Sequence, residues 1–178
     1  MPSILLVCTA NQCRSPLAEA QLRRYLTTQH PELPWQVESA GTWASAGRSA
    51  HPDMRAAASE VGLDLTSHRA RNVETLELND YDLILTMEQS HKEAIRVEFS
   101  AIRERVYQLS EMVGIAYDVP DPIGGSAADF RTTVRELDRL LQFALPRIVK
   151  LASQQAEQRQ PTTTGALGRT ESLDKVTN

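Results

Sequence analysis

The chain has 178 residues, of which 41% are hydrophobic and 24% are charged, and its formal net charge is −4 at pH 7. These proportions fit one folded domain with a buried core. The negative charge excludes a global basic field for nucleic acid or an anionic membrane. The early apolar run, residues 4–8, is too short to span a membrane. Neither nucleic acid nor membrane is therefore an expected partner, and any anion site must be local.

The cysteines and histidines give no sign of a metal or of export. Cys8, Cys13 and the four histidines have no zinc-site spacing, and two cysteines do not make a disulfide framework. Residues 1–7 lack the basic segment and the long apolar core of a signal peptide. We therefore expect a cytoplasmic protein with no metal site.

Strands and helices alternate along the chain. Apolar runs predict strands at residues 3–8, 35–41, 81–88 and 105–109, and helical periodicity predicts helices at 16–28, 51–63 and 90–99. Pro16 suits the first turn of its helix, and Gly62 should close the 51–63 helix. A long apolar stripe follows Ser126, the expected N-cap, and Pro146 should kink or break that helix.

This order predicts an α/β fold. We expect an open, mostly parallel twisted sheet of about four strands flanked by helices, with right-handed crossovers. The domain should occupy residues 1–153. Residues 154–178 have almost no large apolar side chains, so we expect a polar, disordered tail there.

The loop between the first strand and the first helix, CTANQCRS at residues 8–15, has the features of an anion site. Its backbone N–H groups and the N-terminal end of the helix would converge on a phosphate, and Arg14 offers a planar fork for two oxygens. The same donors favour a Cys8 thiolate, an in-line nucleophile that Ser15 could assist. A small buried thiol would explain Cys8 alone, but it would not explain the Cys-x5-Arg spacing in this context.

A phosphatase also needs an acid to protonate the leaving group. The loop YDVPDPIGGS, residues 117–126, offers Asp118 and Asp121. An Asp-Pro pair in a glycine-rich loop is often only turn chemistry. The residues alone do not separate the two aspartates.

The chain resembles the low-molecular-weight protein tyrosine phosphatases over roughly residues 3–152. The resemblance is carried, in order, by CTANQCRSPLAEA, SAGTWAS at 39–45, GLDLTSHRAR at 62–71, DLILTME at 82–88 and VPDPIGGS at 119–126. It implies Cys8 as nucleophile, Arg14 as phosphate ligand, and Asp121 as the acid and then the base. The implied reaction passes through a phosphocysteine without a metal or organic cofactor.

The resemblance also implies roles for neighbouring residues. The phosphate-binding loop would consist of Thr9, Ala10, Asn11, Gln12, Cys13 and Ser15. Asn11 would be strained and braced by Ser39 and His68, although His68 on its own is typical of a surface histidine. Cys13 could trap an oxidised Cys8 as a disulfide, or be an inert thiol. Trp43 would form a wall of the substrate cleft, or instead pack on the core.

Two departures from the family pattern concern the substrate. Ile123 and Gly124 replace the two tyrosines that many members carry after the Asp-Pro pair. The Asp-Pro-x-Gly-Gly-Ser form resembles bacterial members, some of which dephosphorylate arginine. Gln12 matches neither the isoleucine of tyrosine-selective relatives nor the threonine of arginine-selective ones. The expected substrates are phosphoproteins, carrying phosphotyrosine in the favoured interpretation and phosphoarginine in the alternative.

Two other classes are less consistent with the residues. Arsenate reductases on this scaffold need two further cysteines downstream, and this chain has none beyond Cys13. A non-catalytic phosphoryl carrier with a similar loop lacks the arginine, because it must not hydrolyse its phosphocysteine. Arg14 and Asp121 together disfavour that class.

Overall fold

The computed structural model describes residues 1–159 and contains a four-stranded sheet in the order β2-β1-β3-β4. Its strands are β1 (Ser3–Cys8), β2 (Gln36–Gly41), β3 (Leu83–Thr86) and β4 (Val106–Gln108). Each neighbouring pair is parallel. The expected α/β architecture is confirmed, and the sheet is parallel throughout.

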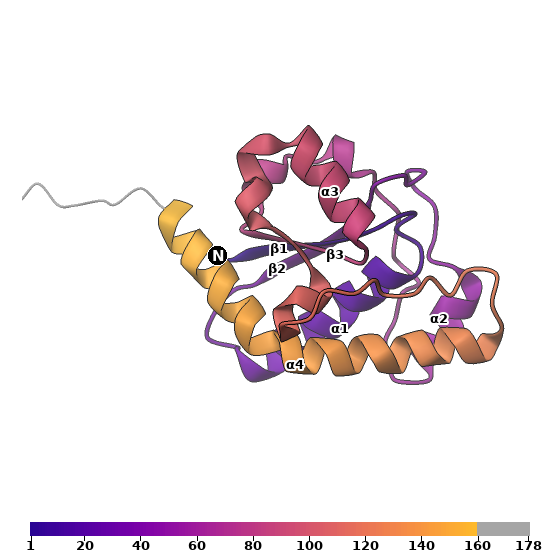
Figure 1. The fold of residues 1–178 in the computed structure, drawn as a ribbon. Helices are drawn as coiled ribbons and strands as arrows, with labels where there is room; N and C mark the ends of the chain where they lie inside the picture. The colour runs from indigo at the N-terminus through magenta and orange to yellow at the C-terminus, as the bar shows by residue number, and fades with distance from the viewer. Residues whose placement is uncertain (160–178) are drawn as a thin grey trace, which may run out of the picture.

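Helices cover both faces of the sheet (Figure 1). One face carries α1 (Arg14–Gln29), α2 (Pro52–Ser59) and α4 (Ala127–Arg159), and the other carries α3 (Gln89–Glu98). Successive β1 side chains point to opposite faces, so Ile4 and Leu6 join the core under α1, α2 and α4. Leu5 and Val7 join the core under α3. Because both faces are buried, the strand is a continuous apolar run.

Helix α2 is shorter than expected, whereas α4 begins directly after Ser126, the expected N-cap. Helix α2 ends at Ser59, and a turn through Gly62, with φ of 74°, follows it. The N–H and hydroxyl of Ser126 both donate to the Asp129 carboxylate, over 2.6 and 2.8 Å, so the capping acceptor is Asp129. Pro146 lies inside α4 without ending it. Figure 1 shows that α4 bends along its length, so the helix is kinked and not broken.

The folded part extends beyond residue 153. Helix α4 continues to Arg159, whose Nη2 donates to Asp82 Oδ2 at 3.2 Å. Asp82 is fully buried, and Ala156 is buried as well. The expectation of disorder is therefore wrong for residues 154–159, because these polar turns pack on the sheet through a few contacts. The expectation for residues 160–178 lies outside the described residues.

The sheet order places a topological switch point between β1 and β3. The chain crosses from β1 to β2 on one side and reaches β3 on the other. In open parallel sheets, ligands bind at such a point, beyond the carboxyl ends of the strands. These ends are Cys8 and Thr86, and the loops that follow them form the candidate site.

Candidate active site

The phosphate-binding loop, residues 8–15, lies directly against the end of β2. A Cβ atom on Gly41 would lie 2.4 Å from the Thr9 carbonyl oxygen and 2.8 Å from the Asn11 nitrogen, so only glycine fits. Just beyond it, the N–H of Thr42 donates to Cys8 O at 3.0 Å, and the N–H of Trp43 donates to Thr9 O at 2.9 Å. The loop is therefore fixed to β2 through backbone contacts.

Asn11 holds the loop from inside. It is fully buried, and it is the only non-glycine residue with positive φ, 53°, in the described part of the chain. Its Nδ2 donates to Ser15 Oγ and Ser39 Oγ, both at 2.9 Å, and its Oδ1 accepts from the N–H of Arg71. His68 Nε2 lies 2.7 Å from Asn11 O, so this nitrogen carries the proton. The structure thus brings together the residues expected to brace the loop.

Cys8 lies at the base of the loop and is 3% exposed. Its Sγ is 3.0 Å from Ser15 Oγ. The same hydroxyl is 3.2 Å from the Ala40 carbonyl oxygen. Since Ser15 has one hydroxyl hydrogen and also accepts from Asn11, it can donate to Ala40 beside a thiol or turn to a thiolate. Ser15 is therefore placed to respond to the charge of Cys8.

Arg14 is the largest buried polar side chain of the site, with 1% exposure. Its Nη1 donates to Glu88 and, at 2.8 Å, to Val119 O. Its Nη2 donates to Asp121 Oδ2 at 2.6 Å and to Thr9 Oγ1 at 3.4 Å. These contacts fix the guanidinium plane between the loop, the end of β3 and the Asp-Pro loop (residues 117–126).

The structure separates the two aspartates of the Asp-Pro loop. Asp118 Oδ1 accepts from the N–H of Gln89 at 2.8 Å and from Gln108 Nε2 at 2.6 Å, so it ties the loop to α3 and β4. Asp121 reaches Arg14 instead, and its Oδ1 accepts from the N–H of Ile123 at 3.1 Å. Asp121 is therefore the carboxylate next to the phosphate-binding loop.

Sequence reasoning missed two residues after β3. Glu88 is the N-cap residue of α3 and forms an ion pair with Arg14. His91, in the first turn of α3, contacts Thr9 through its Nε2. Glu88 closes the segment DLILTME, and the carboxyl ends of adjacent parallel strands meet at one edge. That adjacency was the available signal, but the order of the strands was needed to use it.

The remaining expected residues lie around the loop. Burial, with added contributions from the charges of Asp121 and Cys8, raises the pKa of the Cys13 thiol to about 12. Both cysteines are free. Gln12 is half-buried, and its carbonyl oxygen accepts from the N–H of His51 at 2.9 Å; Ala10 is half-buried too. Trp43 is 84% exposed, so the alternative that it packs on the core is wrong. Its place in a cleft wall stays a prediction.

Two kinds of feature are absent from residues 1–159. No group of three or more histidine, cysteine, aspartate or glutamate side chains in this range could hold a metal ion. No helix in this range combines the length and the apolar character needed to cross a membrane.

Comparison with known proteins gives a consistent result. The family model described as low molecular weight phosphotyrosine protein phosphatase matches residues 3–157. The low molecular weight protein-tyrosine-phosphatase Wzb of Escherichia coli K12 is 39% identical over 137 residues, which are 77% of this chain and 88% of Wzb. The protein-arginine-phosphatase of Bacillus subtilis is 37% identical over 140 residues, 78% of this chain and 91% of its own. A crystal structure of a Bacillus subtilis YwlE mutant superposes with a TM-score of 0.77 at 34% identity, covering 84% of this chain and 99% of that one.

Proposed function

Because the chain belongs to the low molecular weight phosphotyrosine protein phosphatase family, we propose that it hydrolyses phosphotyrosine in proteins through a phosphocysteine on Cys8. One observation carries this proposal. The nucleophile's loop, the buried Arg14 and the Asp121 carboxylate meet at the carboxyl end of β1, with Asp121 Oδ2 2.6 Å from Arg14 Nη2.

The first step is attack of Cys8 Sγ on phosphorus. A phosphoryl oxygen takes the place of Asp121 on Arg14 Nη2, because a dianion binds a guanidinium more strongly than one carboxylate does. Glu88 and Val119 hold Nη1 through this exchange, so the guanidinium keeps its orientation. Asp121, released from Arg14 but still on the same loop, takes up a proton from solvent and gives it to the leaving oxygen as the S–P bond forms and the P–O bond breaks.

The second step is hydrolysis of the phosphocysteine. Asp121 takes a proton from the attacking water, and sulfur leaves as a thiolate. The Ser15 hydroxyl, 3.0 Å from Cys8 Sγ, stabilises that thiolate by turning from the Ala40 carbonyl oxygen. The backbone donors of the loop hold the phosphoryl oxygens in both steps and stabilise the charge of each transition state.

Phosphoarginine is the second candidate substrate. The 37% identity to a protein-arginine-phosphatase supports it, as does the amide of Gln12, which could accept a hydrogen bond from a guanidinium. Gln12 and the exposed side chains of Trp43 and Ile123 carry no charge, so a phenyl ring would suit them equally well. The residue at position 12, here Gln12, is therefore the one we expect to decide between phosphotyrosine and phosphoarginine.

The test is a side-by-side assay of phosphotyrosine and phosphoarginine peptides of matched sequence. We expect a higher kcat/KM for phosphotyrosine, raised further by Gln12→Ile and lowered by Gln12→Thr. A higher kcat/KM for phosphoarginine would transfer the proposal to that substrate. Turnover of neither peptide, with the fold intact, would refute it.

The expected partners and compartment follow from the same chemistry. Phosphorylated proteins are the substrates. Two buried free thiols, Cys8 and Cys13, suit a reducing cytoplasm. The arsenate reductase and phosphoryl carrier alternatives stay disfavoured, since the chain has no cysteine beyond Cys13 and combines Arg14 with Asp121.

A further inference from the structure

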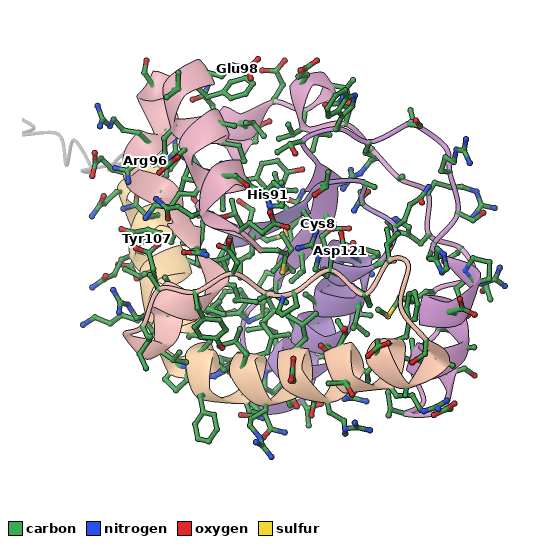
Figure 2. All side chains as sticks on the ribbon, turned by 45° about the vertical axis from the view of Figure 1, so that its right-hand side comes forward. Cys8, His91, Arg96, Glu98, Tyr107 and Asp121 are labelled. Atoms are coloured by element: carbon green, nitrogen blue, oxygen red, sulfur yellow. The ribbon has the colours of Figure 1, made fainter. Side chains whose placement is uncertain are left out.

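The first turn of α3 faces the phosphate-binding loop. Its His91 is 5% exposed, and its Nε2 lies 2.9 Å from Thr9 Oγ1. Figure 2 shows His91 near Cys8 and Asp121 in the middle of the view, whereas Arg96 and Glu98 lie further along the helix. Nothing in the two-step mechanism above uses this histidine.

The surroundings of His91 define which nitrogen carries its proton. Burial, with a smaller contribution from the Arg14 charge, holds the pKa of His91 below its usual 6.5, although Glu88, Asp118 and Asp121 oppose this shift. The ring is therefore neutral at pH 7 and has one N–H. Its Nδ1 is buried and has no hydrogen-bond partner among the described residues. An orphaned N–H is rarer than an orphaned acceptor, so the proton belongs on Nε2, which donates it to Thr9.

The Thr9 hydroxyl then has both acceptor positions filled. It accepts from His91 Nε2 at 2.9 Å and from Arg14 Nη2 at 3.4 Å. A hydroxyl has two lone pairs and one hydrogen, so its hydrogen must point away from both donors. Apart from these two contacts, the Thr9 hydroxyl makes no hydrogen bond among residues 1–159. The Thr9 hydroxyl lies beside Arg14 Nη2, the guanidinium nitrogen that a phosphoryl oxygen would contact.

We propose that the Thr9 hydroxyl donates a hydrogen bond to a phosphoryl oxygen bound at Arg14, and that His91 is the positioning residue that orients this hydroxyl. The inference rests on the proposed function, because it assigns the phosphoryl group to this loop. It adds a side-chain donor to the backbone donors of the loop. Since the contact is to the phosphoryl group, it serves phosphotyrosine and phosphoarginine alike.

A purely structural role for His91 predicts something different. In that case the ring only fills space between α3 and the loop, and its loss would lower stability without acting through the Thr9 hydroxyl. Coupling between the two side chains distinguishes these roles, since residues that act through one contact give non-additive effects.

The test is a double-mutant cycle with Thr9→Val and His91→Ala, together with Thr9→Ser and His91→Gln. Two quantities are measured: the Kd of orthovanadate by calorimetry and kcat/KM for an aryl phosphate. Thr9→Val should raise the Kd of orthovanadate and lower kcat/KM, each by about ten- to a hundredfold, which corresponds to one hydrogen bond to a charged acceptor. His91→Ala should change the Kd and kcat/KM in the same directions but by less than Thr9→Val does. In the Thr9→Val background, His91→Ala should have no further effect.

The conservative variants and a neighbouring residue supply the controls. Thr9→Ser keeps the hydroxyl, and His91→Gln keeps an N–H donor, so both should stay close to the wild type. Lys92→Met removes the Lys92–Glu111 ion pair on the same helix and should lower stability without changing the Kd of orthovanadate.

Two results would overturn the inference. One is an unchanged Kd of orthovanadate for Thr9→Val. The other is a double variant whose loss of affinity is the product of the losses of the two single variants. A wild type that binds orthovanadate but hydrolyses no phosphate ester would refute the proposed function alone. The binding arm would still decide the role of Thr9.

Discussion

Replacing Asn11 by alanine should loosen the phosphate-binding loop and lower the unfolding free energy of the protein. The side chain is fully buried and makes three hydrogen bonds, to Ser15 Oγ, to Ser39 Oγ and from the N–H of Arg71. Alanine loses all three and also has to adopt a φ of 53°. At about 0.5–1.5 kcal/mol for each bond and about 1 kcal/mol for the left-handed backbone, the loss is roughly 2.5–5.5 kcal/mol.

The assay is urea unfolding, followed by circular dichroism, together with orthovanadate binding by the folded protein. Asn11→Gly loses the same hydrogen bonds but accepts positive φ, so it should be more stable than Asn11→Ala. Asn72→Ala is a matched control, since it removes only one cap bond, to the N–H of Glu74 at 3.0 Å. The control should cost about 1 kcal/mol and leave binding unchanged. An Asn11→Ala variant as stable as Asn72→Ala, with normal binding, would refute the bracing role.

Three further predictions concern the Asp-Pro loop, the end of α4 and the second cysteine. Asp121→Ala should lower kcat by about 10²–10⁴-fold, the usual range for a general acid. Asp118→Ala should mainly lower stability, because the hydrogen bonds from Gln89 and Gln108 are lost. If Asp118→Ala lowers kcat more than Asp121→Ala does, Asp118 is the acid. A chain truncated after Ser153 should be roughly 2–3 kcal/mol less stable to urea than one truncated after Arg159, because the buried Asp82 loses Arg159. Equal stabilities of the two truncated chains would contradict this. Folding raises the pKa of Cys13 from 9.0 to about 12. The neutral Cys13 thiol therefore contributes its full stabilisation below pH 9.0, and this stabilisation is lost as the pH rises from there toward 12. The difference in unfolding free energy between wild type and Cys13→Ala should fall over that interval, and a flat difference would contradict the shift.

The sequence contains enough information for the order of elements and for the position of the Cys-x5-Arg loop. The β1 run ends on Cys8, and Arg14 follows at a fixed spacing before a helix, so local pattern suffices there. Asp118 and Asp121 could not be separated in this way, because their roles depend on which side chains of α3, β4 and α1 each one meets. Glu88 and His91 were missed for the same reason, since their partners lie more than seventy residues away in the sequence.

Composition was a poor guide at the end of the chain. Residues 154–159 are polar and were expected to be disordered, but Arg159 reaches the buried Asp82. A helix that is already nucleated can continue through polar residues when a few contacts support its last turn. Trp43 shows the opposite limit, because its residue type favours burial while its position on a tight loop leaves it 84% exposed.

The central claim is that Cys8 carries the phosphoryl group between the two steps. The direct measurement is rapid acid quench of the enzyme during turnover of an aryl phosphate, followed by peptide mass spectrometry. Asp121→Ala should raise the trapped fraction with a substrate whose leaving group needs no acid, because it slows the second step. The claim predicts one added phosphoryl group on the peptide that contains Cys8, located on that residue, and none in Cys8→Ala under the same quench. Turnover without this adduct, or an adduct on another residue, would contradict it.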